Sequence, residues 1–250
     1  MAPRAPVTER RLRDAALVLC AHGIRGGVGG AAEHAARIAA RRVFAEVHSC
    51  ALKGAPGLSE VVATVSAREI VFAPLLMAEG YTLQAMLRKL QGASDRATPV
   101  TVCRPIGVHP RLANMIASRA GALCAAKGWQ PADTALLIVG HGTERHPESG
   151  VTARRHAAHI AAREIYAEVA TAFLDERPRV PETLRALTAP TCVAVGLFVD
   201  AGEHGEEDIP ALLAPAGERA VYAGPIGPDP LVTELILDQA DAALEASIAA

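Results

Sequence analysis

Three histidines in this chain occupy positions where imidazole could do chemistry. His22 and His141 each end an apolar run and precede a glycine, in LVLCAHG and LLIVGHG. His204 follows another apolar run, within GLFVDAGEHGEEDIP at residues 196–210. Neutral imidazole binds divalent transition metals, and with an unperturbed pKa of about 6.5 it also accepts protons near neutral pH. Two such side chains brought together could hold a metal ion and take up protons.

Carboxylates accompany His204 in particular. Glu206 and Glu207 follow it, and Glu203 and Asp208 flank this group. Oxygen ligands suit the transit of a divalent cation, whereas nitrogen ligands suit its capture. A structural explanation stays open beside this one, because acidic residues are also favoured at helix N-termini. A histidine at a strand end can likewise be a cap or a polar residue at the rim of a sheet.

The chain is an internal repeat, which strengthens the case for the histidines. His22 recurs as His141 at a shift of 119 residues. The segment ARIAARRVFAEV (36–47) recurs as AHIAAREIYAEV (158–169) with eight of twelve positions identical, and Pro-Ile-Gly at 105–107 recurs at 225–227. Two copies of one supersecondary unit therefore make up the protein.

Each copy alternates short apolar runs with amphipathic segments, a pattern typical of a parallel sheet covered by helices. The expected strands are 15–21, 47–52, 70–75 and 100–103, then 135–140, 170–173, 192–197 and 220–223. Ligands of open α/β sheets bind beyond the carboxyl ends of the strands. If the strand order is 2-1-3-4, His141 and His204 emerge side by side. We therefore predict an α/β protein with two tandem three-layer α/β/α domains, each with a four-stranded parallel sheet.

The repeat also suggests a division into domains. We expect a loose N-terminal arm at residues 1–14, a first repeat at 15–128 and a second repeat at 135–250. Residues 129–134 are polar and rich in turn formers, so they are the expected linker. The final apolar, alanine-rich helix could pack on its own sheet or on a second copy, so a homodimer is compatible with the sequence.

The first copy lacks the histidine pair. Alignment of Gly80 with Gly202 places Thr82 where the second copy has His204. Glu79 is the one acid of that loop that could serve as a relay. The sequence therefore predicts one complete site, in the second copy, and a partly degenerate site around His22.

Composition excludes several classes of protein. A formal net charge of -2 argues against a general nucleic-acid binder, which needs clustered cations. No apolar stretch approaches the length of a membrane span or a signal peptide. The five scattered cysteines contain no C-x-x-C pair and are expected to be reduced, which favours the cytoplasm.

The order of these motifs resembles one known family. The set comprises strand-His-Gly, AFLDERPRVPETL (172–184), GLFVDAGEHGEEDIP, and Pro-Ile-Gly before the last helix. Together these motifs are similar to those of the sirohydrochlorin chelatases among the class II chelatases, over almost the whole chain from Ala15. Such proteins have tandem α/β domains facing a cleft that takes a tetrapyrrole. They insert cobalt or iron into sirohydrochlorin, on the way to cobalamin or sirohaem, without ATP.

The resemblance implies a role for specific residues. The two metal-binding, catalytic histidines of the family fall on His141 and His204. The metal is then a substrate, Co2+ or Fe2+ with Ni2+ not excluded, and no nucleotide is needed. Glu206, Glu207 and Glu79 are candidate relays of metal or protons. Because the tetrapyrrole is rimmed with carboxylates, the candidate substrate-binding residues are His22, Arg25, Arg104, Arg145 and His146.

Two readings from other classes remain open. A carrier of metal or tetrapyrrole would use the same cleft without catalysis. A histidine phosphohydrolase also places His-Gly after its first strand, but there an arginine precedes the histidine, and here Ala21 and Gly140 do. Without that arginine a phosphohistidine mechanism lacks its stabiliser of charge.

Overall fold

The computed structural model describes residues 6–23, 27–93, 98–144, 150–202 and 204–249, with the backbone alone at residues 6–9, His204 and Ala249. It contains two parallel four-stranded sheets. The first has the order β2-β1-β3-β4, from β1 (Ala15–Ala21), β2 (Glu46–Ala51), β3 (Glu69–Pro74) and β4 (Val100–Val102). The second has the order β6-β5-β7-β8, from β5 (Thr134–Gly140), β6 (Glu168–Phe173), β7 (Thr191–Gly196) and β8 (Ala220–Pro225). The predicted fold class and the 2-1-3-4 order are confirmed.

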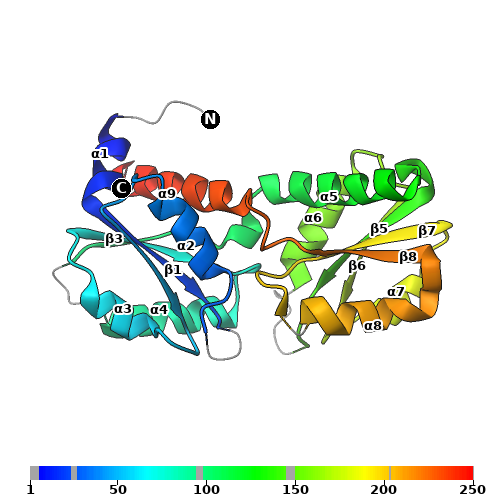
Figure 1. Ribbon diagram of the computed structural model, residues 1–250, viewed down its shortest axis with the longest axis horizontal. Coiled ribbons are helices and arrows are strands. Elements are labelled where there is room, and N and C mark those ends of the chain that lie inside the picture. The colour runs from blue at the N-terminus through cyan, green and yellow to red at the C-terminus, as the bar shows by residue number, and fades with distance from the viewer. Residues whose placement is uncertain (1–5, 24–26, 94–97, 145–149, 203, 250) are drawn as a thin grey trace. The chain divides into compact units, whose positions relative to one another are not determined.

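Helices follow the strands as the amphipathic pattern predicted (Figure 1). The first repeat contains α2 (Ala31–Ala39), α3 (Leu58–Thr64), α4 (Tyr81–Ala93) and α5 (Arg111–Lys127). The second contains α6 (Val151–Ala161), α7 (Val180–Ala186), α8 (Ile209–Leu213) and α9 (Val232–Ala249). Short turns of helix lie at η1 (Ile106–Val108), η2 (Pro131–Asp133), η4 (His204–Asp208) and η5 (Ala214–Arg219). The helix α5 ends at Gly128, which is left-handed at φ +69° and so forms the usual glycine cap.

The last helix of each repeat packs on the sheet of the other repeat. Contacts of α5 are with α6 and with strands β5, β7 and β8, whereas α9 contacts β3, β4 and α2 (Figure 1). One compact unit therefore comprises residues 1–76, 81–106 and 229–250. The other comprises residues 77–80 and 107–228. These units, called unit 1 and unit 2 below, divide the chain differently from the sequence repeats 15–128 and 135–250, because their final helices are exchanged.

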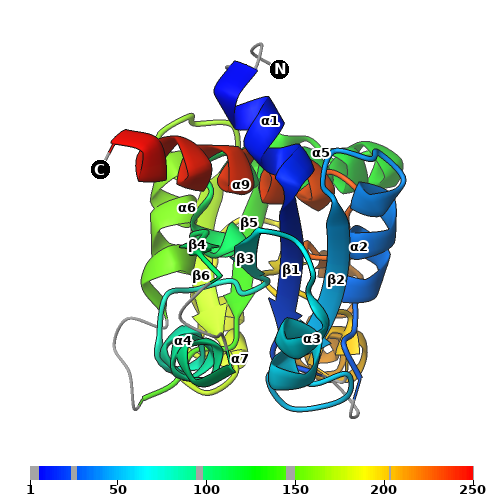
Figure 2. The same ribbon diagram turned by 90° about the vertical axis from the view of Figure 1, so that its left-hand side faces the viewer.

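The segment expected to be a loose arm is a helix. Residues Pro6–Asp14 form α1, which contacts α9 and β1 within unit 1 (Figure 2). The side chain of Leu12 is buried, and the Arg11 guanidinium forms two hydrogen bonds with the Glu69 carboxylate, at 2.5 and 3.2 Å. Arg11 also donates to the Ser247 hydroxyl of α9 at 2.9 Å. The sequence prediction missed this helix because its apolar residues are few.

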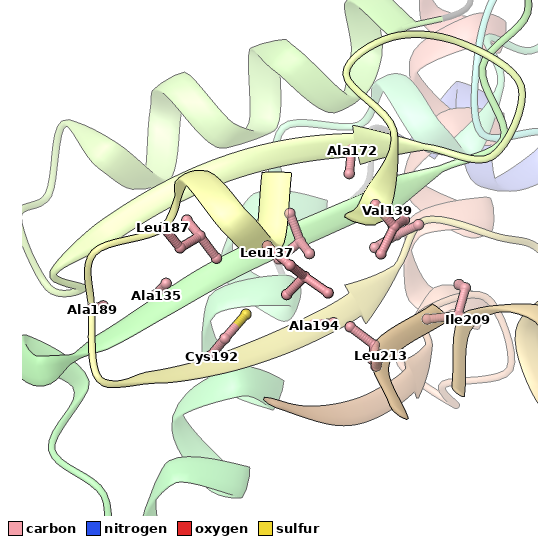
Figure 3. Packing of buried hydrophobic residues seen from close by; sticks show 12 residues of the cluster. Ala135, Leu137, Val139, Ala172, Leu187, Ala189, Cys192, Ala194, Ile209 and Leu213 are labelled. Carbon is pink, nitrogen blue, oxygen red and sulfur yellow. The ribbon is translucent and has the colours of Figure 1, made fainter. Parts of the chain in front are cut away.

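The cores are aliphatic, as the low aromatic content predicted. In the second sheet, Leu137 and Val139 of β5 pack against the helices of one face, including Ile209 and Leu213 of α8 (Figure 3). Every residue of β1 and of β5 is buried, since helices cover both faces of each sheet. All five cysteines are free and buried. Among the described residues, no helix has the length and apolar character to cross a membrane.

Candidate metal centre

His141 is the first residue after the buried strand β5, and its side chain is half exposed, at 51%. Its Nδ1 lies 2.9 Å from the carbonyl oxygen of Gly142. A carbonyl oxygen can only accept a hydrogen bond, so Nδ1 of the neutral ring carries the proton and donates it. In that tautomer Nε2 holds the lone pair, as binding of a metal through Nε2 requires.

Asp175 lies beside His141 because β6 pairs with β5 in the sheet. The Asp175 amide donates to the His141 carbonyl oxygen at 2.9 Å. The Asp175 carboxylate lies 3.6 Å from His141 Nδ1, and its side chain is 63% exposed. Asp175 was not among the residues predicted from the sequence, although it lies within the AFLDERPRVPETL segment. Its position at the end of the neighbouring strand was the available signal.

His204 follows the strand on the other side of β5. Strand β7 pairs with β5, and the Leu197 amide donates to the Val139 carbonyl at 2.7 Å. The backbone of His204 begins the short π-helix η4. His141 and His204 thus lie in segments that leave the carboxyl ends of adjacent strands, as expected. The side chain of His204 lies outside the described part of the chain, so its pairing with His141 remains a prediction.

The Pro-Ile-Gly motif fixes the backbone between β7 and η4. Gly227 donates its N–H to the Phe198 carbonyl at 2.9 Å, and a Cβ on Gly227 would overlap the backbone of Val199. Gly107 is packed in the same way against the backbone of Met77. Only glycine allows these close approaches, which explains why the motif recurs. Gly227 therefore holds the start of the segment that leads to His204.

The other predicted residues are scattered along the carboxyl edges of the two sheets. Glu206 and Glu207 are exposed on η4, where they precede α8. Glu79, after β3, and Arg104, after β4, are exposed, as is His22 after β1. Arg25, Arg145 and His146 lie outside the described residues. Among the residues whose placement is described, no group of three metal-ligating side chains is found.

The first repeat has the same backbone but the opposite charge beside its histidine. The Lys53 amide donates to the His22 carbonyl at 2.9 Å, which repeats the contact of Asp175 with His141. Lys53 therefore occupies the position of Asp175. A cation in place of a carboxylate disfavours a divalent ion at His22.

The model of the CbiX family matches this sequence twice, over residues 16–123 and 135–243. The chain belongs to the CbiX family. It has one copy of the family domain in each half, and this confirms the resemblance to sirohydrochlorin chelatases that the motifs indicated.

Relatives of this CbiX family member match over most of its length. A protein of Halobacterium salinarum, named a probable sirohydrochlorin cobaltochelatase, is 29% identical, with 90% of each chain covered. A solved CbiX, described as the terminal enzyme of siroheme biosynthesis in denitrifying bacteria, is 25% identical at a TM-score of 0.71, covering 91% of this chain and 98% of that one. A multi-domain Deinococcus radiodurans protein with structural similarity to chelatases gives a TM-score of 0.75 at 25% identity, with 90% of this chain covered. The chain spans about half of that longer protein, 54%.

Proposed function

We propose that this protein inserts Co2+ or Fe2+ into sirohydrochlorin without ATP, in the biosynthesis of cobalamin or sirohaem. Its family and the names of its relatives support this activity. The five buried free thiols fit a reducing compartment, and we place the reaction in the cytoplasm.

The observation that carries the proposal is the hydrogen bond from His141 Nδ1 to the Gly142 carbonyl. It presents the Nε2 lone pair from a half-exposed ring at the carboxyl end of β5, where ligands of α/β sheets bind.

We assign the metal site to unit 2. His141 is the first ligand, His204 the second, and Asp175 contributes negative charge beside His141. Neutral imidazole and carboxylate accept Co2+, Fe2+ and also Ni2+, so the available metal decides which one is used. The site must stay under-coordinated, because a closed four-ligand cage would retain an ion that has to be delivered to the product.

Protons leave as the metal enters. A divalent ion replaces two pyrrole N–H protons, so the net charge of the macrocycle with its centre is conserved. Once the metal has passed to the macrocycle, the ring nitrogens of His141 and His204 that held it can accept these protons, for which imidazole is suited near neutral pH. The exposed acids Glu206 and Glu207 relay protons or metal to solvent, and Glu79 is a further candidate relay.

Sirohydrochlorin is the partner of the site, and its peripheral carboxylates call for cations. The candidates remain those of the sequence: His22, Arg25, Arg104, Arg145 and His146. We expect a residue that clamps these carboxylates to affect KM more than kcat when it is replaced by alanine.

An anaerobic absorbance assay with sirohydrochlorin and Co2+ or Fe2+ tests the function. We expect His141→Ala and His204→Ala to lose metal insertion and His22→Ala to keep a substantial part of it. Absence of insertion by the wild-type protein with either metal would refute the proposed function. Tight binding of the tetrapyrrole without any rate enhancement would instead favour a carrier.

A further inference from the structure

Glu176, next to Asp175, has a side chain that is 13% exposed and makes two charge-assisted contacts. One carboxylate oxygen pairs with the Arg154 guanidinium of α6. The other accepts a hydrogen bond from the Thr143 amide at 3.2 Å. Glu176 therefore links α6 to the first residues after β5.

The Thr143 amide belongs to the peptide group that fixes His141. The N–H of Thr143 and the carbonyl of Gly142 are the two ends of one planar unit. Its N–H donates to Glu176, while its carbonyl accepts from His141 Nδ1. A carboxylate on the N–H side both orients this peptide and makes its carbonyl a stronger acceptor, since hydrogen bonds in a chain polarise one another.

The packing around this peptide leaves little room for another orientation. Gly142 is left-handed, at φ +68°, and a Cβ there would lie 2.6 Å from the Glu176 Cβ and 2.8 Å from the Phe173 Cβ. Arg154 is held in turn, because its guanidinium carbon lies 4.9 Å from the centre of the Phe173 ring. The pair of Arg154 and Glu176 is thus braced against the end of β6.

The first repeat lacks this arrangement. At the shift of 122 residues that aligns the helices, Glu176 corresponds to Gly54 and Arg154 to Ala32. Both charged residues are absent from the copy that also has Lys53 in place of Asp175. The two side chains therefore occur together with the complete candidate site.

We infer that Glu176, held by Arg154, is a positioning residue that acts through the Gly142–Thr143 peptide on His141, and so sets the tautomer and orientation of the metal-binding imidazole. This inference rests on the proposed function only in assigning the metal to His141. Glu176 itself touches neither metal nor substrate in this scheme.

The test compares Co2+ binding and turnover in Glu176→Ala and Glu176→Gln. Glu176→Ala should weaken Co2+ binding about tenfold, as loss of an outer partner of a metal ligand typically does, and change the Co2+ absorption spectrum. It should lower kcat with little change in the KM for sirohydrochlorin. Glu176→Gln keeps an oxygen for the Thr143 amide and should recover most of the affinity. Arg41→Ala, which breaks the Arg41–Glu234 ion pair in unit 1, is the matched control and should leave Co2+ binding unchanged.

A double-mutant cycle with His141→Ala decides whether the effect runs through that histidine. In the His141→Ala background, Glu176→Ala should cause no further loss of Co2+ affinity. An equal loss in both backgrounds would overturn the inference, as would wild-type Co2+ affinity in a folded Glu176→Ala protein or equal losses in the alanine and glutamine variants. If the wild type binds Co2+ but inserts none, the proposed function fails, while the Co2+ titration still tests Glu176.

Discussion

At the scale of single residues, the two repeats carry side chains of opposite charge beside equivalent histidines. His22 and His141 leave equivalent strands, and the residue whose amide bonds each carbonyl is Lys53 in one half and Asp175 in the other. A carboxylate 3.6 Å from the His141 ring attracts a divalent ion, whereas an ammonium group at the same place would repel it. This difference supports the proposal that the metal site lies in unit 2.

Replacing Asp175 should make the proposed site resemble the equivalent position of the first repeat. We expect Asp175→Asn to weaken Co2+ binding about tenfold, because it removes a charge beside a ligand and keeps the shape. Asp175→Lys, which copies the first repeat, should abolish binding at concentrations that saturate the wild type. Titration of Co2+ followed by its absorbance measures both. Glu218→Gln is the control, since Glu218 is exposed just before β8, at the opposite edge of the sheet. Unchanged affinity in Asp175→Lys would exclude Asp175 from the site.

At the scale of elements, two buried histidines fasten the exchanged segments. His34 of α2 bonds the Thr233 hydroxyl of α9 at 2.9 Å. His156, at the equivalent position of α6, bonds the Gly107 carbonyl just before α5, at 2.7 Å. Each histidine thus forms a hydrogen bond with a residue that belongs to the other sequence repeat.

Burial lowers the pKa of His156 below its ordinary value of 6.5, so the native state keeps the ring neutral. The unfolded chain takes up this proton first as the pH falls through about 6.5, so the free energy of unfolding should decrease from near pH 7 downward. His156→Gln keeps a donor for the Gly107 carbonyl but cannot titrate, and it should flatten this slope in urea unfolding measured from pH 5 to 8. The exposed His159→Gln on the same helix is the control. The same slope in His156→Gln and in the wild type would contradict the assignment.

The Pro-Ile-Gly glycines should tolerate no side chain. We expect Gly227→Ala and Gly107→Ala each to cost about 3 kcal/mol or more of unfolding free energy, because the new Cβ overlaps backbone that cannot turn aside. Gly92→Ala is the control: no atom lies within 4 Å of a Cβ there, and the change in α4 should stabilise by up to about 1 kcal/mol. Urea unfolding measures all three. An unchanged free energy of unfolding in Gly227→Ala would show that the contact of Gly227 with Val199 does not hold the loop before His204.

At the scale of the whole molecule, the exchange makes each unit depend on both repeats. Helix α9 buries six apolar side chains in unit 1, those of Val232, Leu235, Ile236, Leu237, Ala240 and Leu244. Burial of a large aliphatic side chain contributes roughly 1.5–3 kcal/mol, and a domain is stable by only about 5–15 kcal/mol. Unit 1 therefore cannot spare this helix, although the helix belongs to the second repeat.

Removal of α9 should unfold unit 1 and spare unit 2. In a chain ending at Pro228, we expect circular dichroism to show lost helix while Trp129, the single tryptophan, still reports a cooperative transition of unit 2. A chain ending at Ser247, which keeps all six buried side chains and the hydroxyl that Arg11 contacts, should behave as the full chain does. If the truncated chain lost the Trp129 transition while unit 1 stayed folded, α9 would support the second sheet instead.

The sequence by itself determined the strands and the position of His22, His141 and His204 just after three of them. Apolar runs of strand length, interrupted by amphipathic segments, permit few other folds, and the shift of 119 residues between His22 and His141 marks equivalent strand ends. The sequence did not reveal that Asp175 lies beside His141, because that depends on which strand pairs with β5. Nor did it reveal the hydrogen bond from the Thr143 amide to Glu176, which depends on the orientation of the Gly142–Thr143 peptide. It also missed α1, which Leu12 and Arg11 hold against the rest of unit 1.

Only the tertiary structure decided which sheet each final helix covers. The buried positions of α5 recur in α9 at a shift of 120 residues, so that Leu112 corresponds to Val232, Ile116 to Ile236 and Cys124 to Leu244. Faces so alike could pack on either sheet, and their pattern along the chain carries no preference. The choice is seen in contacts between segments far apart in the sequence, such as His34 with Thr233 and His156 with Gly107, which the sequence pattern does not specify.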